Sequence, residues 1–425
     1  MKTVLLLATT TGYQIRAFGD AAARAGVRLR FASDRCDQLD DPWWDSAIPV
    51  RFHEVERSAD AIVAALHEAP LDGILAVGDR PTVLAATVAR RLGLPGHPPS
   101  AAAASRNKLA TRRAFEGAGL LVPAFRPVSL SAAPADPVAG VGYPAVVKPL
   151  ALSGSRGVMR VDDAAECVAA IERLARLLRA PDIRTERDAA HGECLVEAFI
   201  PGRECAVEGL LTDGALRVLA MFDKPDPLEG PFFEETIYVT PSREAAPVQE
   251  AMGQAVAAAC RALGLHHGPV HAECRVNERG IYVLEVAARP IGGLCSRALR
   301  FEEGQSGARG RGRHSLEDIL LRHAIGEDVA GVVRESGASA VMMIPIPRRG
   351  IYKGVAGVEE AARVPGVEDI RMTTKLDAVV IPLPEGHSYL GFIFASAAAP
   401  AAAEHAVRAA HAHLRFDIAR ELTVL

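Results

Sequence analysis

The first hundred residues alternate between short apolar runs and stretches with helical spacing, and this alternation constrains the fold more than any other feature. Strands are predicted at Thr3–Ala8, Val27–Ala32 and Gly73–Val77. Helices are predicted at Tyr13–Ala25, Ala59–His67 and Thr82–Leu92. Strands that alternate with helices indicate βαβ units and a parallel sheet.

Short polar segments follow each of these predicted strands, at Thr9–Gly12, Ser33-Asp34 and Gly78-Asp79. A parallel sheet binds its ligands at the carboxyl ends of its strands, which is where these segments fall. They are therefore either ordinary loops or contacts to a substrate.

The 425 residues suffice for several domains. Gly93–Pro99 is rich in Gly and Pro and marks a first boundary. From Tyr143 to about Phe301 strands and helices mix without βαβ repetition, which is α+β character, and a third piece runs from about Val341 to Leu425. We predict domains over residues 1–97, 98–335 and 336–425.

Charge and cysteine content exclude several classes of protein. The net charge of -4 gives no support for a general nucleic-acid or anionic-membrane binder. Gln305–Arg313 is rich in Gly and Arg, and is either an RNA contact or a flexible surface insertion.

The seven cysteines form no C-x-x-C pair, and the apolar run after Met1 is too short for a signal peptide. Free thiols and a cytoplasmic location are expected.

Two lysines lie where nucleotide phosphates can be bound. Lys148 ends the apolar run Pro144–Pro149, and the small residues of Ser153–Val158 follow it. Small residues let backbone N–H groups surround phosphate oxygens, although most Gly-rich turns are simple hairpins. Lys108 begins a predicted helix, where it opposes the helix dipole. It is either a solvated lysine or a second cation for phosphates.

Two carboxylates lie seven residues apart across a tight turn, at Glu197 and Glu204. Such groups can accept hydrogen bonds from an adenine amino group and from ribose hydroxyls. The alternative is a salt-bridged hairpin.

The strongest chemical signal is a pair of glutamates on two apolar runs. Glu273 lies in the run that begins at His271, and Glu285 lies in the run that ends before Arg289, with a turn at Asn277–Gly280 between them. A hairpin would bring the two carboxylates together, and two like charges need a cation between them. Mg²⁺ prefers such ligands, so we predict a metal site; the alternative is two solvent-facing side chains.

Taken in order, these elements resemble the ATP-grasp superfamily over about residues 1–301. The resemblance implies a pre-ATP-grasp domain with a parallel sheet, a two-part ATP-grasp fold with a lid at about 128–200, and a small α+β C-terminal domain. It implies that ATP phosphates contact Lys108, Lys148 and the loop residues Ser153, Gly154, Ser155, Gly157 and Val158. It further implies adenine contacts at Glu197, Ala198, Phe199 and Ile200, a ribose contact at Glu204, Mg²⁺ (or Mn²⁺) on Glu273 and Glu285, and Arg289 beside the reacting carboxylate.

One position departs from the superfamily pattern. Many members have Asn two residues after the second metal-binding glutamate, where this chain has Ala287. This form is similar to the L-amino-acid ligases, which make dipeptides, as is His271 two residues before Glu273. His271 is then either a contact to the acyl phosphate or amine, or a structural histidine.

The resemblance implies that ATP activates a carboxylate as an acyl phosphate, which an amine then attacks. It also implies a homodimer, while the charge balance argues against nucleic-acid and membrane partners. Glu235, in a polar and aromatic loop, is a candidate for binding an ammonium group. The rival readings are an enzyme of the biotin-carboxylase or purine-pathway type, which uses bicarbonate or formate, and a regulatory protein that binds ATP without turnover.

Overall fold

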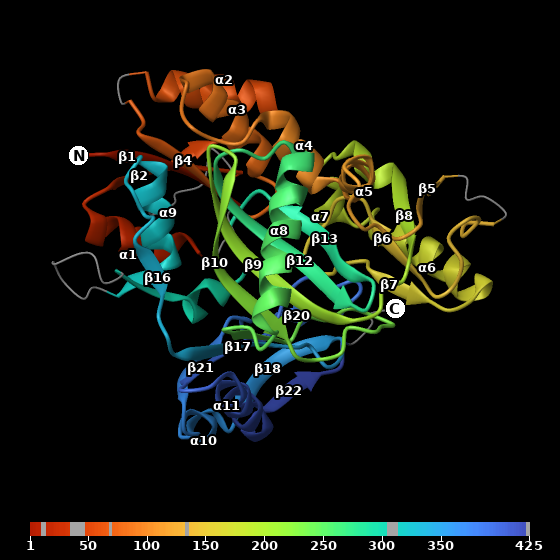
Figure 1. Ribbon diagram of the computed structural model, residues 1–425. Coiled ribbons are helices and arrows are strands. Elements are labelled where there is room, and N and C mark those ends of the chain that lie inside the picture. The colour runs from red at the N-terminus through yellow and green to blue at the C-terminus, as the bar shows by residue number, and fades with distance from the viewer. Residues whose placement is uncertain (10–13, 35–46, 68–69, 132–135, 304–312, 422–425) are drawn as a thin grey trace.

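The structure is a computed structural model that describes residues 1–9, 14–34, 47–67, 70–131, 136–303 and 313–421 (Figure 1). Residues 10–12 of the first polar segment, Cys36 and residues 305–312 of the Gly/Arg-rich segment lie outside the described residues. The six described cysteines are free and buried. None of the described helices combines the length and the apolarity that crossing a lipid bilayer requires.

The N-terminal residues form a four-stranded sheet with the order β3-β2-β1-β4, in which every pairing is parallel, as predicted. Its strands are β1 (Thr3–Ala8), β2 (Arg28–Ser33), β3 (Ala47–Pro49) and β4 (Gly73–Val77), accompanied by α1 (Ile15–Ala25), α2 (Val55–Ala65) and α3 (Thr82–Leu92). Val4 and Leu6 pack into one apolar cluster, and Leu5 and Leu7 pack into another. Both faces are therefore covered, as a parallel sheet requires.

A second, antiparallel sheet spans most of the residues predicted to form the lid and is called the lid below; its order is β5-β8-β6-β7. Its strands are β5 (Phe125–Ser129), β6 (Ala145–Pro149), β7 (Met159–Val161) and β8 (Glu193–Ala198). The helices before and within it are α4 (Pro99–Arg106), α5 (Lys108–Gly117), α6 (Ala164–Leu177), α7 (Pro181–Arg184) and the 3₁₀ turn η1 (Ala189–Gly192). Side chains alternate along β6, so Val147 packs with Leu174 of α6, whereas Lys148 points to the opposite face.

The largest sheet has eight antiparallel strands in the order β13-β12-β9-β10-β11-β17-β21-β19. The strands are β9 (Arg203–Thr212), β10 (Ala215–Lys224), β11 (Ile237–Thr240), β12 (Gly268–Asn277), β13 (Gly280–Ala287), β17 (Ala338–Ile344), β19 (Val367–Met372) and β21 (Gly391–Ala397). Helix α8 (Ala246–Leu263) packs on β9 and β12. Because β11 pairs with β17, the sheet runs without a break across the predicted boundary at 335/336.

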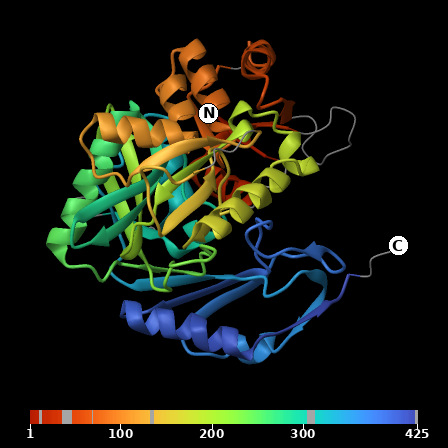
Figure 2. The ribbon, with the colours of Figure 1, turned by 90° about the vertical axis from the view of Figure 1, so that its right-hand side faces the viewer.

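Smaller elements complete the molecule. They are η2 (Cys295–Ala298), β14 (Arg300–Glu303), β15 (His314–Ser315), α9 (Leu316–Ala324), β16 (Val332–Arg334), β18 (Gly350–Ala356), α10 (Val358–Ala362), β20 (Val379–Val380), α11 (Pro400–His413) and β22 (Arg415–Ala419). Helix α9 packs against the N-terminal sheet, where a Cβ at Gly73 would lie 2.2 Å from the carbonyl oxygen of Ala324. Figure 2 shows α11 along the outer side of the C-terminal strands.

Three histidines gather where the N-terminal part meets the largest sheet. The rings of His267 and His323 stack with centroids 4.4 Å apart, and together with His97 they line a small, otherwise mostly apolar cavity. His97 Nε2 lies 3.3 Å from the carbonyl oxygen of Pro269, and His323 Nε2 lies 2.9 Å from Thr212 Oγ1. Burial lowers the pKa of His97 and of His323 to about 4, so both rings are neutral at neutral pH.

Acidification is expected to weaken the fold through these rings. Between about pH 6.5 and about pH 4 the unfolded chain binds protons that the folded chain does not. The stabilisation is therefore complete above pH 6.5, and is lost as the pH falls towards 4. His97 and His323 together should lower the free energy of unfolding by on the order of 2–4 kcal/mol at about pH 5. The nearby carboxylate of Asp213 is 81% exposed and offsets little of this.

Urea unfolding at neutral and acidic pH measures this loss. The double variant His97→Gln/His323→Gln should lose much less stability on acidification than the wild-type protein. His405→Gln, at an exposed position on α11, is the matched control and should behave as wild type. An equal acid-dependent loss in the double variant would contradict the prediction.

Candidate active site

A cavity of about 720 Å³ lies where the three sheets meet. The N-terminal sheet contributes Asp79, the lid contributes the glycine-rich loop, and the C-terminal strands contribute Phe392. Of the predicted site residues, Gly157 and Ala198 are outside its wall. The others all line it: Lys108, Lys148, Ser153, Gly154, Ser155, Val158, Glu197, Phe199, Ile200, Glu204, His271, Glu273, Glu285 and Arg289.

Strand periodicity explains why so many polar side chains share this wall. Residues two apart on a strand point to the same face of a sheet. His271, Glu273 and Arg275 therefore line the cavity from β12, while Cys274 between them packs into the apolar core beneath α8. Glu285 lines it from β13 in the same way.

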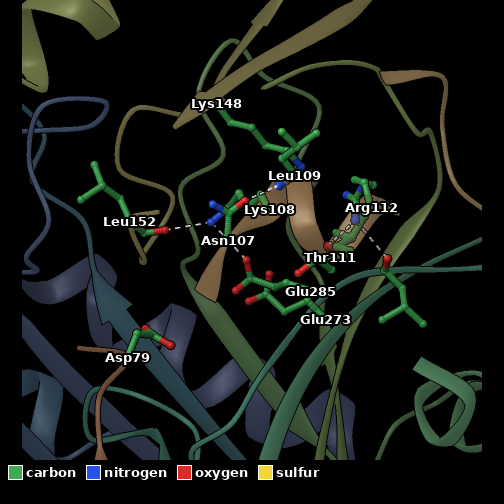
Figure 3. A network of polar contacts seen from close by, with 12 residues as sticks. Asp79, Asn107, Lys108, Leu109, Thr111, Arg112, Lys148, Leu152, Glu273 and Glu285 are labelled. Carbon is green, nitrogen blue, oxygen red and sulfur yellow. Dashed lines mark hydrogen bonds and ion pairs between the residues drawn. The ribbon is translucent and has the colours of Figure 1, made fainter. Parts of the chain in front are cut away.

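The predicted hairpin is present, and its register places Glu273 directly opposite Glu285. A bulge at Leu284 shifts the register next to this pair. The two carboxylates pair with different lysines in this structure. Glu285 lies 3.5 Å from Lys108 Nζ, which also donates to the carbonyl oxygen of Leu152 at 2.8 Å (Figure 3). The positive charge that the two neighbouring carboxylates require is thus supplied in part by lysine side chains of the protein.

Lys224, at the end of β10, provides the other cation, a role that its position in the sequence does not reveal. Its ammonium donates to Glu204 at 2.8 Å, to Glu235 at 2.8 Å and to Glu273 at 2.9 Å. Although burial opposes its charge, these carboxylates raise the pKa of Lys224 well above its usual value. The ammonium that Glu235 binds in this structure therefore belongs to the chain itself. The Tyr238 hydroxyl donates to the other oxygen of Glu235.

Glu204 is fully engaged by neighbouring cations. Its second oxygen accepts from Arg275 Nε at 2.9 Å, and Arg275 Nη1 donates to the carbonyl oxygen of Ile200 at 2.5 Å. Glu197 and Glu204 do not form the alternative salt-bridged hairpin, because β8 and β9 lie in different sheets and the partners of Glu204 come from β10 and β12. Glu204 also lines the cavity, and its contact to ribose stays a prediction.

Glu197 belongs to a buried ionic cluster that sequence reasoning missed. Arg112 of α5 is fully buried and donates to both oxygens of Glu197, at 2.8 and 3.1 Å, while Lys148 also donates to one of them. Arg112 also donates to the carbonyl oxygen of Leu284 at 2.7 Å. Burial would raise the pKa of Glu197, but the charges of Arg112 and Lys148 outweigh it and lower the pKa to about 2.

Two backbone amides that follow Glu197 already have hydrogen-bond partners within the chain. The amide of Ala198 donates to the carbonyl oxygen of Ala124, and the amide of Phe199 donates to that of Pro144, each at 2.9 Å. These two N–H groups are used within the chain, which removes them as donors to an adenine ring.

The glycine-rich loop joins β6 to β7 in a tight turn. Gly154 and Ser155 have φ values of 64° and 55°, in the left-handed region. The predicted phosphate contact of Gly157 stays a prediction, although its amide already donates to the carbonyl oxygen of Pro384 at 2.8 Å. A Cβ at Gly157 would also lie 2.9 Å from Leu174, so this glycine serves packing.

Arg289 is held by the N-terminal sheet. Its Nε and Nη2 each donate to one oxygen of Asp79 at 3.0 Å, in a bidentate pair. Burial alone would raise the pKa of Asp79, but the charge of Arg289 lowers it overall. The Gly78-Asp79 segment therefore lines the cavity. A contact of this segment to a substrate, one of its two predicted roles, requires this position.

His271 is held by a buried carboxylate. Its Nδ1 lies 3.0 Å from Glu208, which also accepts from the amide of Ile291 at 3.2 Å. Burial raises the pKa of Glu208. His271 thus has a structural partner in Glu208 and also lines the cavity, while its contact to the acyl phosphate or amine stays a prediction.

Family models match three parts of the chain. The ATP-grasp N-terminal domain matches residues 19–96, the ATP-grasp domain matches residues 141–298, and the L-amino acid ligase C-terminal domain 2 matches residues 342–419. The solved structure of an L-amino acid ligase from Bacillus licheniformis superimposes with a TM-score of 0.82 at 26% identity, over 98% of this chain and 99% of that chain.

Curated relatives extend the comparison. Protein y4rH of Sinorhizobium fredii is 28% identical over 76% of this chain and 63% of its own length. Carnosine synthase 1 of Gallus gallus is 29% identical over 65% of this chain and 31% of its own length. The chain thus spans less than two thirds of either protein. The family matches and the full-length superposition show that the chain belongs to the ATP-grasp superfamily and is similar to its L-amino acid ligases.

Proposed function

We propose that the protein is an ATP-dependent ligase that joins the carboxylate of an amino acid to an amine and releases ADP and phosphate. The observation that carries the proposal is one cavity in which Glu273 and Glu285 lie beside Lys108, Lys148 and Arg289. Phosphoryl transfer from ATP needs fixed cations for the phosphates and carboxylates for a metal, and this wall offers both.

In the first step an oxygen of the substrate carboxylate attacks the γ-phosphorus of ATP, and the bond to the bridging oxygen breaks. ADP leaves with the electron pair, and an acyl phosphate forms. Lys108, Lys148 and the loop Ser153–Val158 hold the phosphates during this transfer. Their role is electrostatic, because negative charge shifts onto oxygen as the bond breaks.

In the second step the amine nitrogen attacks the acyl carbon. The tetrahedral intermediate carries an oxyanion, which the guanidinium of Arg289 faces. The C–O bond to phosphate then breaks, the amide forms, and the nitrogen loses a proton. Asp79 keeps Arg289 in one orientation. His271, fixed through Glu208, contacts the acyl phosphate or the amine.

Mg²⁺, or Mn²⁺ in its place, fits the residues present. Glu273 and Glu285 are half-buried, lie opposite each other on the cavity wall and offer only oxygen donors. When bound, the ion offsets the charge of the ATP phosphates. Ala287 lines the same wall without a ligand atom, so the protein supplies fewer metal ligands than superfamily members with Asn there.

Four side chains of the cavity wall belong to one apolar cluster, which favours an acid substrate with an apolar side chain. These side chains are Ile291, Cys295, Met343 and Phe392, all buried. The sulfur atoms of Cys295 and Met343 are 3.8 Å apart. A charged side chain against these four residues would lose hydration that they do not replace.

The test is phosphate release from ATP and Mg²⁺ over pairs of amino acids, with mass detection of the product. We expect phosphate and a condensed product in equal amounts for pairs whose acid component is apolar. Bicarbonate and formate arms test the other ATP-grasp chemistries. Phosphate release with either of these, and with no amino-acid pair, would overturn the proposal. Nucleotide binding without release in any arm would instead indicate a regulatory protein.

Two finer expectations belong to this proposal, a cytoplasmic location and a homodimer. Fractionation of cells that express the protein tests the first. Light scattering during size-exclusion chromatography tests the second, since a dimer doubles the mass of the 425-residue chain.

A further inference from the structure

A short segment between β20 and β21 leaves the C-terminal strands and reaches the lid. We call residues 383–389 the latch segment. Its turn is closed by the amide of Gly386, which donates to the carbonyl oxygen of Pro382 at 2.9 Å. A Cβ at Gly386 would lie 1.8 Å from the carbonyl oxygen of Ile381, so only glycine fits here. The glycine at position 386 therefore allows the tight turn that the segment adopts.

The latch segment binds the glycine-rich loop through its backbone. The carbonyl oxygen of Pro384 accepts from the amide of Gly157 at 2.8 Å. The carbonyl oxygen of Glu385 accepts from Arg156 Nε at 2.9 Å. Two consecutive residues of the latch segment thus bind two consecutive residues of the loop that lines the cavity.

The side chain of Glu385 adds a second attachment, to helix α6. Arg173 donates to both of its carboxylate oxygens, from Nε at 2.5 Å and from Nη2 at 2.9 Å. The two side chains are 39% and 38% exposed. An ion pair with this exposure is weakened by salt and contributes little to the stability of the whole protein. It can therefore break and re-form without unfolding the chain.

The residues that follow belong to the cavity itself. His387, Ser388 and Tyr389 all line it, as does Arg156 of the glycine-rich loop. One segment of the C-terminal strands therefore does two things: it forms part of the cavity wall, and it holds the loop that is predicted to bind phosphate.

We propose that the latch segment fastens the glycine-rich loop over the cavity, and that Glu385 is the positioning residue of this latch. The inference rests on the proposed ligase function, in which an acyl phosphate must be kept from water. A closed loop excludes water while the acyl phosphate exists, and an opening loop lets the product leave. In this protein the C-terminal strands, in addition to the lid itself, determine how long the loop stays closed.

The experiment compares wild-type protein with Glu385→Gln and Arg173→Gln. Glutamine keeps the size of Glu385 and removes the ion pair. Glu172→Gln, at an exposed position of the same helix, is the matched control.

Hydrogen–deuterium exchange is measured first on the protein without substrates. The amide of Gly157 is bound directly by the latch segment, so exchange of a peptide covering residues 153–158 should be at least five-fold faster in both latch variants and unchanged in the control. Equal exchange rates in wild type and Glu385→Gln would overturn the latch.

The second readout is the ratio of phosphate released to product formed. We expect this ratio to rise about three- to ten-fold in the latch variants, with a higher KM for ATP, because the acyl phosphate is hydrolysed when the loop opens early. High salt should raise the ratio in the wild type and have less effect on Glu385→Gln. An unchanged ratio and KM in folded Glu385→Gln would overturn the latch. A wild type without any phosphate release would overturn the ligase proposal instead, whereas the exchange measurement would still test the contact.

Discussion

Glutamine in place of Glu285 is expected to lower kcat for ligation by about 10²–10³-fold, the loss typical for one removed electrostatic contact in a transition state. The substitution keeps the size of the side chain and removes its charge. It deprives the metal site of one of its two predicted ligands, and it also removes the partner of Lys108 at 3.5 Å. Because Glu285 is half-buried at the cavity wall and outside the apolar clusters, the fold should persist.

The measurement is steady-state phosphate release with saturating amino acids and a titration of Mg²⁺. The variant should need more Mg²⁺ for its residual rate. Glu278→Gln, in the exposed turn of the same hairpin, is the matched control and should keep the wild-type rate. Unchanged turnover in Glu285→Gln with saturating substrates would show that the ligation mechanism is wrong.

Methionine in place of Arg112 is expected to destabilise the protein by about 3–5 kcal/mol, because it leaves one partner of a buried ion pair without its counter-charge. Glu197 would retain only Lys148, and the carbonyl oxygen of Leu284 would lose its donor. The pKa of Glu197 should rise from about 2 at the same time. The loss of stability should therefore be largest near neutral pH, where the carboxylate is charged.

Urea unfolding at neutral pH measures the effect, and Arg113→Met is the matched control. Arg113 is the next residue on the same helix and is exposed, so its substitution should change stability by less than about 0.5 kcal/mol. The double variant Arg112→Met/Glu197→Gln should lose less than the sum of the two single variants. Additive losses would mean that the two residues do not stabilise each other.

The sequence predicted what is local along the chain. The partners Glu273 and Glu285 are joined by a single turn, so the turn suffices to predict that they lie close together, whereas their exact pairing depends on the bulge at Leu284. The parallel N-terminal sheet was predicted for the same reason, since each strand and its helix are read from one window of sequence. The order β3-β2-β1-β4 was not predicted.

The partners of these residues could not be predicted, because they come from distant strands. Lys224 reaches Glu273 only because β9 lies between β10 and β12 in the sheet. Arg112 looks like an ordinary helix residue in the sequence. It is buried because β8 and β13 pack against α5, which the sequence does not reveal. Neither case has a signal in spacing or composition, because the pairing depends on sheet order.

The joint between β11 and β17 has a consequence for how such a protein evolves. Ile237 to Thr240 pair with Ser339 to Met342, so the backbone of one part is satisfied by the other. Loss of the C-terminal strands would leave β11 as an uncovered edge, which invites pairing with other chains. The C-terminal part is therefore not an interchangeable module. Removing it would therefore also require a change that protects the exposed edge of β11.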